Sequence, residues 1–183
     1  MFVKYLAPAA LAGLALTAAV GPAPAVAQQA LVSDSTFILT AASLGLLQAK
    51  LGKLAVEKGS TPSVQEFGRL MVADYAKANE ELAAGAKAAG YPRPVLLREH
   101  RLVFERLAGT GRDSFDKKYL AEIVAEQGDA VRLFQREADG GRVASLKELA
   151  AGMLATVQQH LALATETAGA VGADVTATAS GER

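Results

Sequence analysis

Apolar residues recur at helical spacing in four long segments of this chain. Residues three or four positions apart share one face of an α-helix, so each recurring set marks a face that packs inward. The four sets are Phe37, Ala41, Leu44, Leu51 and Ala55; Val64, Phe67, Met71, Ala78 and Leu82; Phe115, Tyr119, Ile123, Ala130 and Phe134; and Leu146, Ala150, Met153, Val157 and Ala164. The pattern predicts four long helices, and no segment has the alternation of a β-strand.

Glycine and proline mark the ends of these helices. The long helices are expected at about residues 35–58, 62–89, 113–138 and 143–168, with a shorter one at about 96–108. Thr61 supplies a cap for the second helix, and Pro62 suits its first position. Pro92 and Pro94 exclude a helix directly after it. The expected fold class is therefore all-α.

The lengths of the connections predict how the helices are arranged. Short linkers join the first helix to the second and the third to the fourth, so each pair should form an antiparallel hairpin. The connection between the hairpins is roughly 22 residues long and contains the short helix, which is the layout of a ferritin-like four-helix bundle with a crossover. An all-antiparallel bundle with a decorated loop is the alternative.

Polar side chains interrupt each apolar face near its middle. The mid-points of helices of similar length lie at about one height in a bundle, so these side chains should meet in one buried polar layer. The expected members of this layer are Gln48, Asp74, Tyr75, Glu126, Gln127 and His160.

Within this layer, Asp74, Glu126 and His160 are the candidate metal ligands. A dinuclear iron site in a bundle uses carboxylates and Glu-x-x-His pairs from two helices, and this chain has no Glu-x-x-His pair. Two carboxylates and one imidazole could form a mononuclear metal or redox site. The alternative, which the sequence favours, is a hydrogen-bonded network in which amides and a tyrosine satisfy these three groups, with no cofactor expected.

Other chemistry finds little support in the sequence. The second histidine, His100, stands between Glu99 and Arg101 and is expected to face solvent. No serine stands with a histidine and an acid in the manner of a hydrolase triad, and no glycine-rich phosphate loop is present. We therefore assign no catalytic or cofactor-binding residue. The favoured interpretation is a non-catalytic protein.

The first residues have the features of a cleaved export signal. Lys4 gives a positive start, an apolar run extends from Leu6 to Val20, and small residues precede the expected cut between Ala27 and Gln28. The run is too short for a membrane-spanning helix; a retained anchor is the alternative. We expect a signal peptide at 1–27, a flexible leader at 28–34, a helical bundle domain at 35–169 and a disordered tail at 170–183, in a periplasmic or secreted protein.

Composition narrows the range of partners. Removal of residues 1–27 leaves 156 residues (183 − 27 = 156), and only Lys4 among the 19 basic and 19 acidic side chains is lost. Such a balanced charge gives no clustered positive field, so nucleic acid is not expected as a partner. Cysteine is absent, so packing rather than disulfides must stabilise the fold. No later segment is expected to cross a membrane, and the sequence names neither a partner protein nor an oligomeric state.

Several short motifs resemble the bacterial family known as domain of unknown function 4142, whose members are often described as outer-membrane or periplasmic proteins. The resemblance covers about residues 37–169 and implies a ferritin-like bundle. It rests on Gly45 and the segments 51–55 (LGKLA), 67–74 (FGRLMVAD), 79–82 (NEEL), 115–119 (FDKKY), 131–134 (VRLF) and 160–161 (HL). The biochemical role of the family is not established, so the resemblance implies no activity.

The chain departs from this family at the polar layer. Gln48 stands where the family usually has glutamate, Tyr75 follows Asp74 where a histidine is common, and Gln127 replaces a usual histidine. Only Asp74 and His160 keep the polar pattern that the resemblance implies. If members of the family bind a metal in this layer, this chain has lost several of the ligands.

Overall fold

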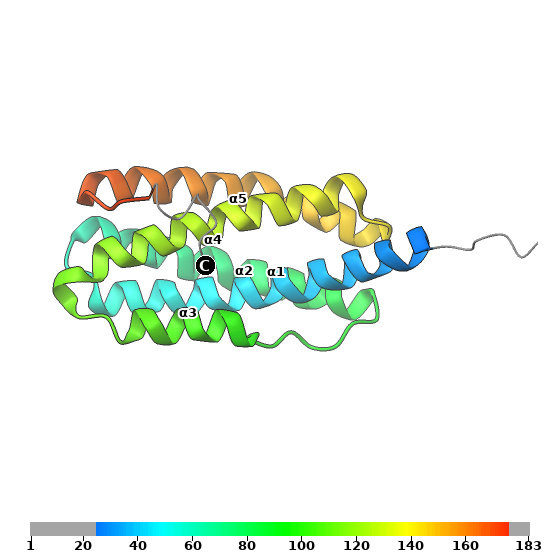
Figure 1. The fold of residues 1–183 in the computed structure, drawn as a ribbon, viewed down its shortest axis with the longest axis horizontal. Coiled ribbons are helices and arrows are strands. Elements are labelled where there is room, and N and C mark those ends of the chain that lie inside the picture. Colours follow the sequence, from blue (N-terminus) through cyan, green and yellow to red (C-terminus); the bar gives the residue numbers. More distant parts are fainter. Residues whose placement is uncertain (1–24, 176–183) are drawn as a thin grey trace, which may run out of the picture.

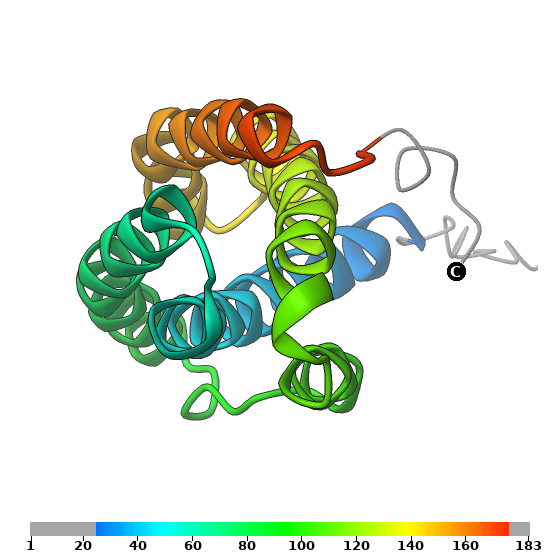
Figure 2. The ribbon, with the colours of Figure 1, turned by 90° about the vertical axis from the view of Figure 1, so that its left-hand side faces the viewer.

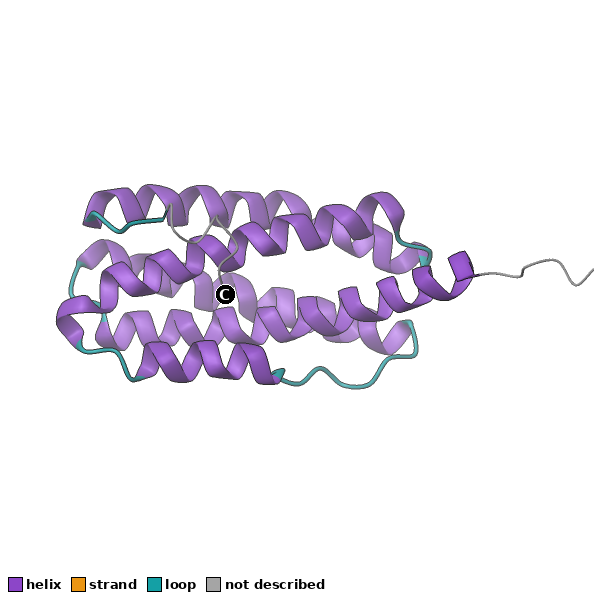
Figure 3. Cartoon of the chain, viewed as in Figure 1, coloured by secondary structure: helices purple, strands orange, loops and turns teal. Residues whose placement is uncertain are grey.

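The computed structural model describes residues 25–175 of the chain, and their side chains from Asp34 onward. Within this range the chain forms helices and no strand (Figure 3). The helices are α1 (Ala25–Lys58), α2 (Pro62–Ala88), α3 (Arg98–Ala108), α4 (Arg112–Gly140) and α5 (Ala144–Val171). The all-α class predicted from the sequence is confirmed.

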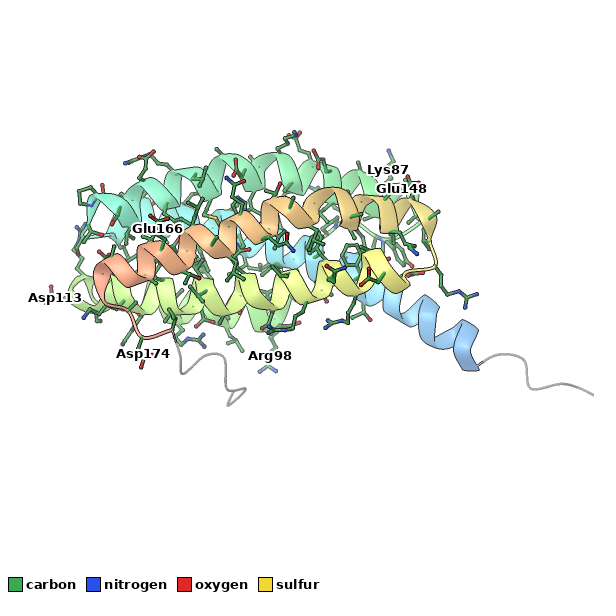
Figure 4. All side chains as sticks on the ribbon, turned by 90° about the horizontal axis from the view of Figure 1, so that it is seen from above. Lys87, Arg98, Asp113, Glu148, Glu166 and Asp174 are labelled. Atoms are coloured by element: carbon green, nitrogen blue, oxygen red, sulfur yellow. The ribbon has the colours of Figure 1, made fainter. Side chains whose placement is uncertain are left out.

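The four long helices lie side by side as two hairpins, α1–α2 and α4–α5 (Figure 1). The crossover with α3 carries the chain back along the molecule, so α2 and α4 run in the same direction. Viewed end-on, the long helices surround a common axis, and α3 lies outside them against α1 (Figure 2). α1 also packs against α4, and α2 packs against α5. Lys87 near the end of α2 and Glu148 near the start of α5 lie at one end of the molecule (Figure 4).

The apolar faces predicted from the sequence form the core between the long helices. Edge-to-face packing of Phe37 and Phe134, with ring centroids 5.2 Å apart, joins α1 to α4. One segment, Asp34–Lys58, is long and apolar enough to cross a membrane by length and composition, but 67% of its most apolar window is buried inside the molecule. We therefore interpret α1 as the core helix of the bundle.

The expected flexible leader at 28–34 is helical in the structure, because α1 begins at Ala25 rather than near residue 35. No proline or glycine interrupts this stretch. Asp34 does not cap its own helix: its fully buried carboxylate accepts hydrogen bonds from the backbone N–H groups of Arg142 (2.9 Å) and Val143 (3.2 Å) at the start of α5. Residues 1–24 of the expected signal peptide lie outside the described residues.

The opposite end of the domain also extends further than expected. α5 continues to Val171, and Ala168 is fully buried in the core. Gly172 then ends the helix in the left-handed conformation (φ 63°), which glycine adopts without steric cost. The remainder of the expected disordered tail, residues 176–183, lies outside the described residues.

The two hairpins are structural counterparts with an offset of 82 positions. Asp116 on α4 stands 82 positions after Asp34 (116 − 34 = 82), and its carboxylate accepts hydrogen bonds from the backbone N–H groups of Ser60 and Thr61, both at 2.9 Å. Each aspartate thus supports the turn of the other hairpin. Gly90 and Gly172, also 82 positions apart, end α2 and α5 with positive φ angles of 80° and 63°. The repeating unit is therefore a whole hairpin of 82 positions. It is visible in the helix bounds and turn contacts rather than as a short repeat in the sequence.

Candidate functional site

Two side-chain pairs form the centre of the polar layer. Gln127 on α4 donates from Nε2 to the hydroxyl oxygen of Tyr75 on α2, at 3.0 Å. His160 Nε2 on α5 lies 2.8 Å from Asp74 Oδ2 on α2. The rings of Tyr75 and His160 are in contact, with centroids 5.3 Å apart. The structure therefore brings four of the six expected layer residues into one connected group.

Burial determines the protonation of the tyrosine in this group. Desolvation raises the pKa of Tyr75 to about 12, the hydrogen bond from Gln127 lowers it, and the nearby charge of Asp74 raises it. The hydroxyl therefore remains protonated at physiological pH. The neutral hydroxyl of Tyr75, hydrogen-bonded to the amide of Gln127, can therefore form hydrogen bonds but cannot act as a general base.

Asp74 and Glu126 are not placed as the sequence analysis expected. The side chain of Asp74 is 39% exposed and lies in a groove of about 460 Å³ between α2 and α5. Glu126 is buried, but it lines a separate cavity beside α3. The reason is geometric: Asp74 and Tyr75, like Glu126 and Gln127, are consecutive on a helix and diverge by about 100°, so only one of each pair points into the bundle centre.

Two members of the layer keep polar atoms without a hydrogen-bond partner among the described residues. Gln48 is fully buried, and neither its Nε2 nor its Oε1 is paired. His160 Nδ1 is also buried and unpaired, so only Nε2 of this ring is engaged. Unpaired buried groups of this kind cost about 1–3 kcal/mol each unless water or a ligand meets them.

The layer lacks the symmetry expected of a dinuclear centre. Such centres in helical bundles use matching ligands from both halves. Positions 82 apart in this chain do not match: His160 corresponds to Ala78, Asp74 to Thr156 and Glu126 to Leu44. Among the side chains that the structure describes, no three His, Asp or Glu residues are grouped to hold a metal ion.

His100 is buried, although the sequence analysis expected it to face solvent. Ser43 Oγ accepts a hydrogen bond from the backbone N–H of Leu97 (2.8 Å) and lies 2.7 Å from His100 Nδ1. No other acceptor for the Ser43 hydroxyl proton lies among the described residues, so we assign this proton to the bond with Nδ1, which leaves a neutral imidazole with its own proton on Nε2. Burial lowers the pKa of His100. The hydrogen bond between Ser43 and His100 joins α1 to α3. It depends on how the crossover packs against α1, so the sequence alone did not predict it.

A second buried polar group, which the sequence did not predict, lies where α1 and α4 meet. Glu137 is 2% exposed, and Asp34 is fully buried beside it. Burial first, and then the charge and hydrogen bonding of Asp34, raise the pKa of Glu137 to about 7, while Lys147 lowers it. Burial and both carboxylates also raise the pKa of Tyr91. A signal was available, because Glu137 continues the apolar face of α4 three positions after Phe134.

Comparison with known protein families agrees with the motifs quoted above. A family model described as "Domain of unknown function (DUF4142)" matches residues 19–167, which include all four long helices through most of their length. The chain belongs to the DUF4142 family. No curated protein and no solved structure matches the chain. Membership in DUF4142 indicates an unknown role and assigns no function to the residues of the polar layer.

Proposed function

We propose that this chain is an exported, non-catalytic helical protein that acts by binding in the bacterial envelope, for example in tolerance of envelope stress. Its fold is a ferritin-like four-helix bundle, and the polar layer holds the helices in register. The parallel direction of α2 and α4 on either side of the crossover supports this fold.

The main support for this proposal is that the polar side chains of the layer form hydrogen bonds with one another between helices. The bond between Tyr75 and Gln127 joins α2 to α4, and the pair of Asp74 and His160 joins α2 to α5. A shift of α2 by a single turn would break both pairs, and a shift of α4 or α5 would break one of them, so the layer favours one register over others. Such a role requires neither an accessible nucleophile nor a ligand.

A mononuclear metal or redox site is the second candidate, and the unpaired Nδ1 of His160 favours it. Asp74 and His160 would be its first ligands, with Glu126 as the third residue from the sequence analysis. Its weakness is that Glu126 lines the cavity beside α3, whereas Asp74 lines the groove between α2 and α5.

The variant His160→Ala tests the two candidates. We expect this variant to lose about 2–3 kcal/mol of unfolding free energy, because it removes a buried ring and the partner of Asp74. Denaturant unfolding and metal analysis by mass spectrometry, on wild type and variant, are the measurements. Thr156→Ala, an exposed change one turn earlier on α5, is the control. Stoichiometric metal in the wild type that disappears with His160→Ala would show that the layer is a metal site.

The export proposal predicts a mature N-terminus at Gln28. Intact-mass measurement of protein made in a bacterial host should show the loss of residues 1–27, and fractionation should recover the protein from the periplasm or the medium. Replacing Ala25 and Ala27 with larger residues should block this cleavage, because signal peptidase requires small side chains there. An uncleaved wild-type chain held in the membrane would contradict the proposal.

A further inference from the structure

A cavity of about 420 Å³ lies between α3 and α4, over one face of α1. Its apolar surface comes from Leu44, Val103 and Leu133. The volume falls in the range of sites for small molecules, which combine apolar walls with a few fixed polar groups. The cavity is separate from the pairs formed by Tyr75, Gln127, Asp74 and His160, none of which lines it.

His100 supplies a fixed hydrogen-bond donor to this cavity. The residue is 8% exposed and lines the cavity, and Ser43 occupies its Nδ1. With the Ser43 hydroxyl proton assigned to the bond with Nδ1, the ring proton of His100 lies on Nε2, which has no hydrogen-bond partner among the described residues. Protonation of both nitrogens would cost the hydrogen bond that Ser43 donates. The imidazole thus offers one neutral N–H group in a defined direction.

Two further features attract negative charge to this cavity. α3 begins at Arg98 without a side-chain cap, so its first N–H groups and the positive end of its dipole lie beside His100. α3 and α4 run in opposite directions (Figure 1), and Arg106 of α3 pairs with Glu122 of α4. Arg136, further along α4, lines the same cavity as Glu99 and His100 in the first turn of α3. Arg136 lines the cavity and forms no ion pair or hydrogen bond within the part of the chain that the structure describes.

Most of the other charged side chains around the cavity form ion pairs or other interactions within the protein. Arg106 pairs with Glu122 at 2.6 Å, and Arg132 pairs with Asp129. Glu126 is buried and has interactions of its own, and Glu99 is exposed at the rim. The donors left to bind a ligand are therefore the His100 N–H, the Arg136 guanidinium and the start of α3, and the exposed Glu99 at the rim is the one charged acceptor without an ion pair among the described lining residues.

From this arrangement we propose that the cavity between α3 and α4 binds a small organic carboxylate with an apolar chain. The carboxylate lies between His100 Nε2 and the Arg136 guanidinium, and the apolar chain contacts Leu44, Val103 and Leu133. Binding would also hold α3 against α4, to which the crossover helix makes few other contacts beyond the pair of Arg106 and Glu122.

The chain contains two histidines, which makes NMR titration a direct test. Hexanoate is the probe, and hexylamine and hexanol are the charge controls. We expect hexanoate to shift the ring signals of His100 and to leave those of His160 unchanged. Arg136→Gln should weaken binding by at least about tenfold, since a hydrogen bond between charged groups is lost. Arg101→Gln, on the exposed side of α3, should leave the affinity unchanged.

Three outcomes would overturn the assignment. Hexylamine could shift His100 as strongly as hexanoate, which would mean that the acidic rim dominates. Hexanol could bind as well as hexanoate, which would leave only an apolar pocket. The affinity for hexanoate could also survive Arg136→Gln. Arg136 is exposed, so its replacement should leave the fold intact, and the melting temperature of the variant verifies this. None of these outcomes bears on the stability test of His160→Ala.

Discussion

Replacing Glu137 with glutamine should stabilise the protein at pH 8 and leave its stability near pH 4 almost unchanged. Glu137 is 2% exposed beside the fully buried Asp34, and its pKa is raised from an ordinary 4.5 to about 7. Both oxygens of Glu137 lack a donor among the described residues, and Asp34 already accepts two backbone N–H groups. A protonated Glu137 can donate to Asp34, whereas an ionised one places two negative charges together.

The sign of the pH dependence follows from this pKa. Between about pH 4.5 and 7 the native state holds a proton on Glu137 that the unfolded chain has released. The free energy of unfolding therefore falls as the pH rises through this window, by an upper limit of about 3 kcal/mol. Tyr91 and Lys147 also face the pair; Tyr91 is neutral in this range, and Lys147 partly offsets the repulsion.

Glutamine keeps the shape of the side chain and donates a hydrogen bond at every pH. Denaturant unfolding at several pH values should show a decline for the wild type and a flatter profile for Glu137→Gln. Glu148→Gln, an exposed change on α5, is the matched control and should retain the wild-type profile. A parallel decline in wild type and Glu137→Gln would show that other groups cause the pH dependence.

Gly68→Ala should destabilise the fold by about 1–3 kcal/mol, even though alanine favours helices more than glycine does. A Cβ atom at Gly68 would lie 2.7 Å from the carbonyl oxygen of Gly52 and 2.9 Å from Ala55 Cβ. The obstruction at Gly52 is backbone, so α1 and α2 must move apart to admit the methyl group. The corresponding positions in the other hairpin are Phe134 and Ala150, so this close approach belongs to α1 and α2 alone.

Gly152→Ala is the matched comparison and should have the opposite sign. A Cβ at Gly152 would meet nothing within 4 Å, so alanine there should stabilise α5 by about 0.5–1 kcal/mol. Urea unfolding of both variants gives the two differences directly. A gain in stability with Gly68→Ala would contradict the close helix approach.

The helices themselves were predictable because their signals are local. The apolar period, the Thr61-Pro62 start of α2 and the glycine at the end of the first helix of each hairpin all act within a few residues. The start of α1 was not predictable from the sequence. The residues Ser33 to Ser35 can cap a helix, and they can equally lie inside one. The structure resolves this ambiguity by using Asp34 for α5 instead.

Periodicity predicted inward-facing positions for the polar residues of the candidate site. Of these, Tyr75, Gln127 and His160 are buried and in contact at the meeting point of the long helices. Periodicity could not separate Asp74 from Tyr75, because both neighbours lie within the wide apolar stripe of a packed helix. The metal hypothesis for Asp74, Glu126 and His160 stays a prediction, although Asp74 and Glu126 line different cavities.

The sequence by itself determined an all-helical chain, the approximate helix bounds and the level at which polar groups enter the core. These follow from propensity and period, which depend on near neighbours. The tertiary structure alone decided that His100 is buried on Ser43, that Glu137 lies beside Asp34, and that α3 forms a cavity with α4. Each of these three contacts joins residues from separate helices. They depend on where the crossover places α3 and on how the two hairpins pack together, and a local sequence pattern contains no information on either.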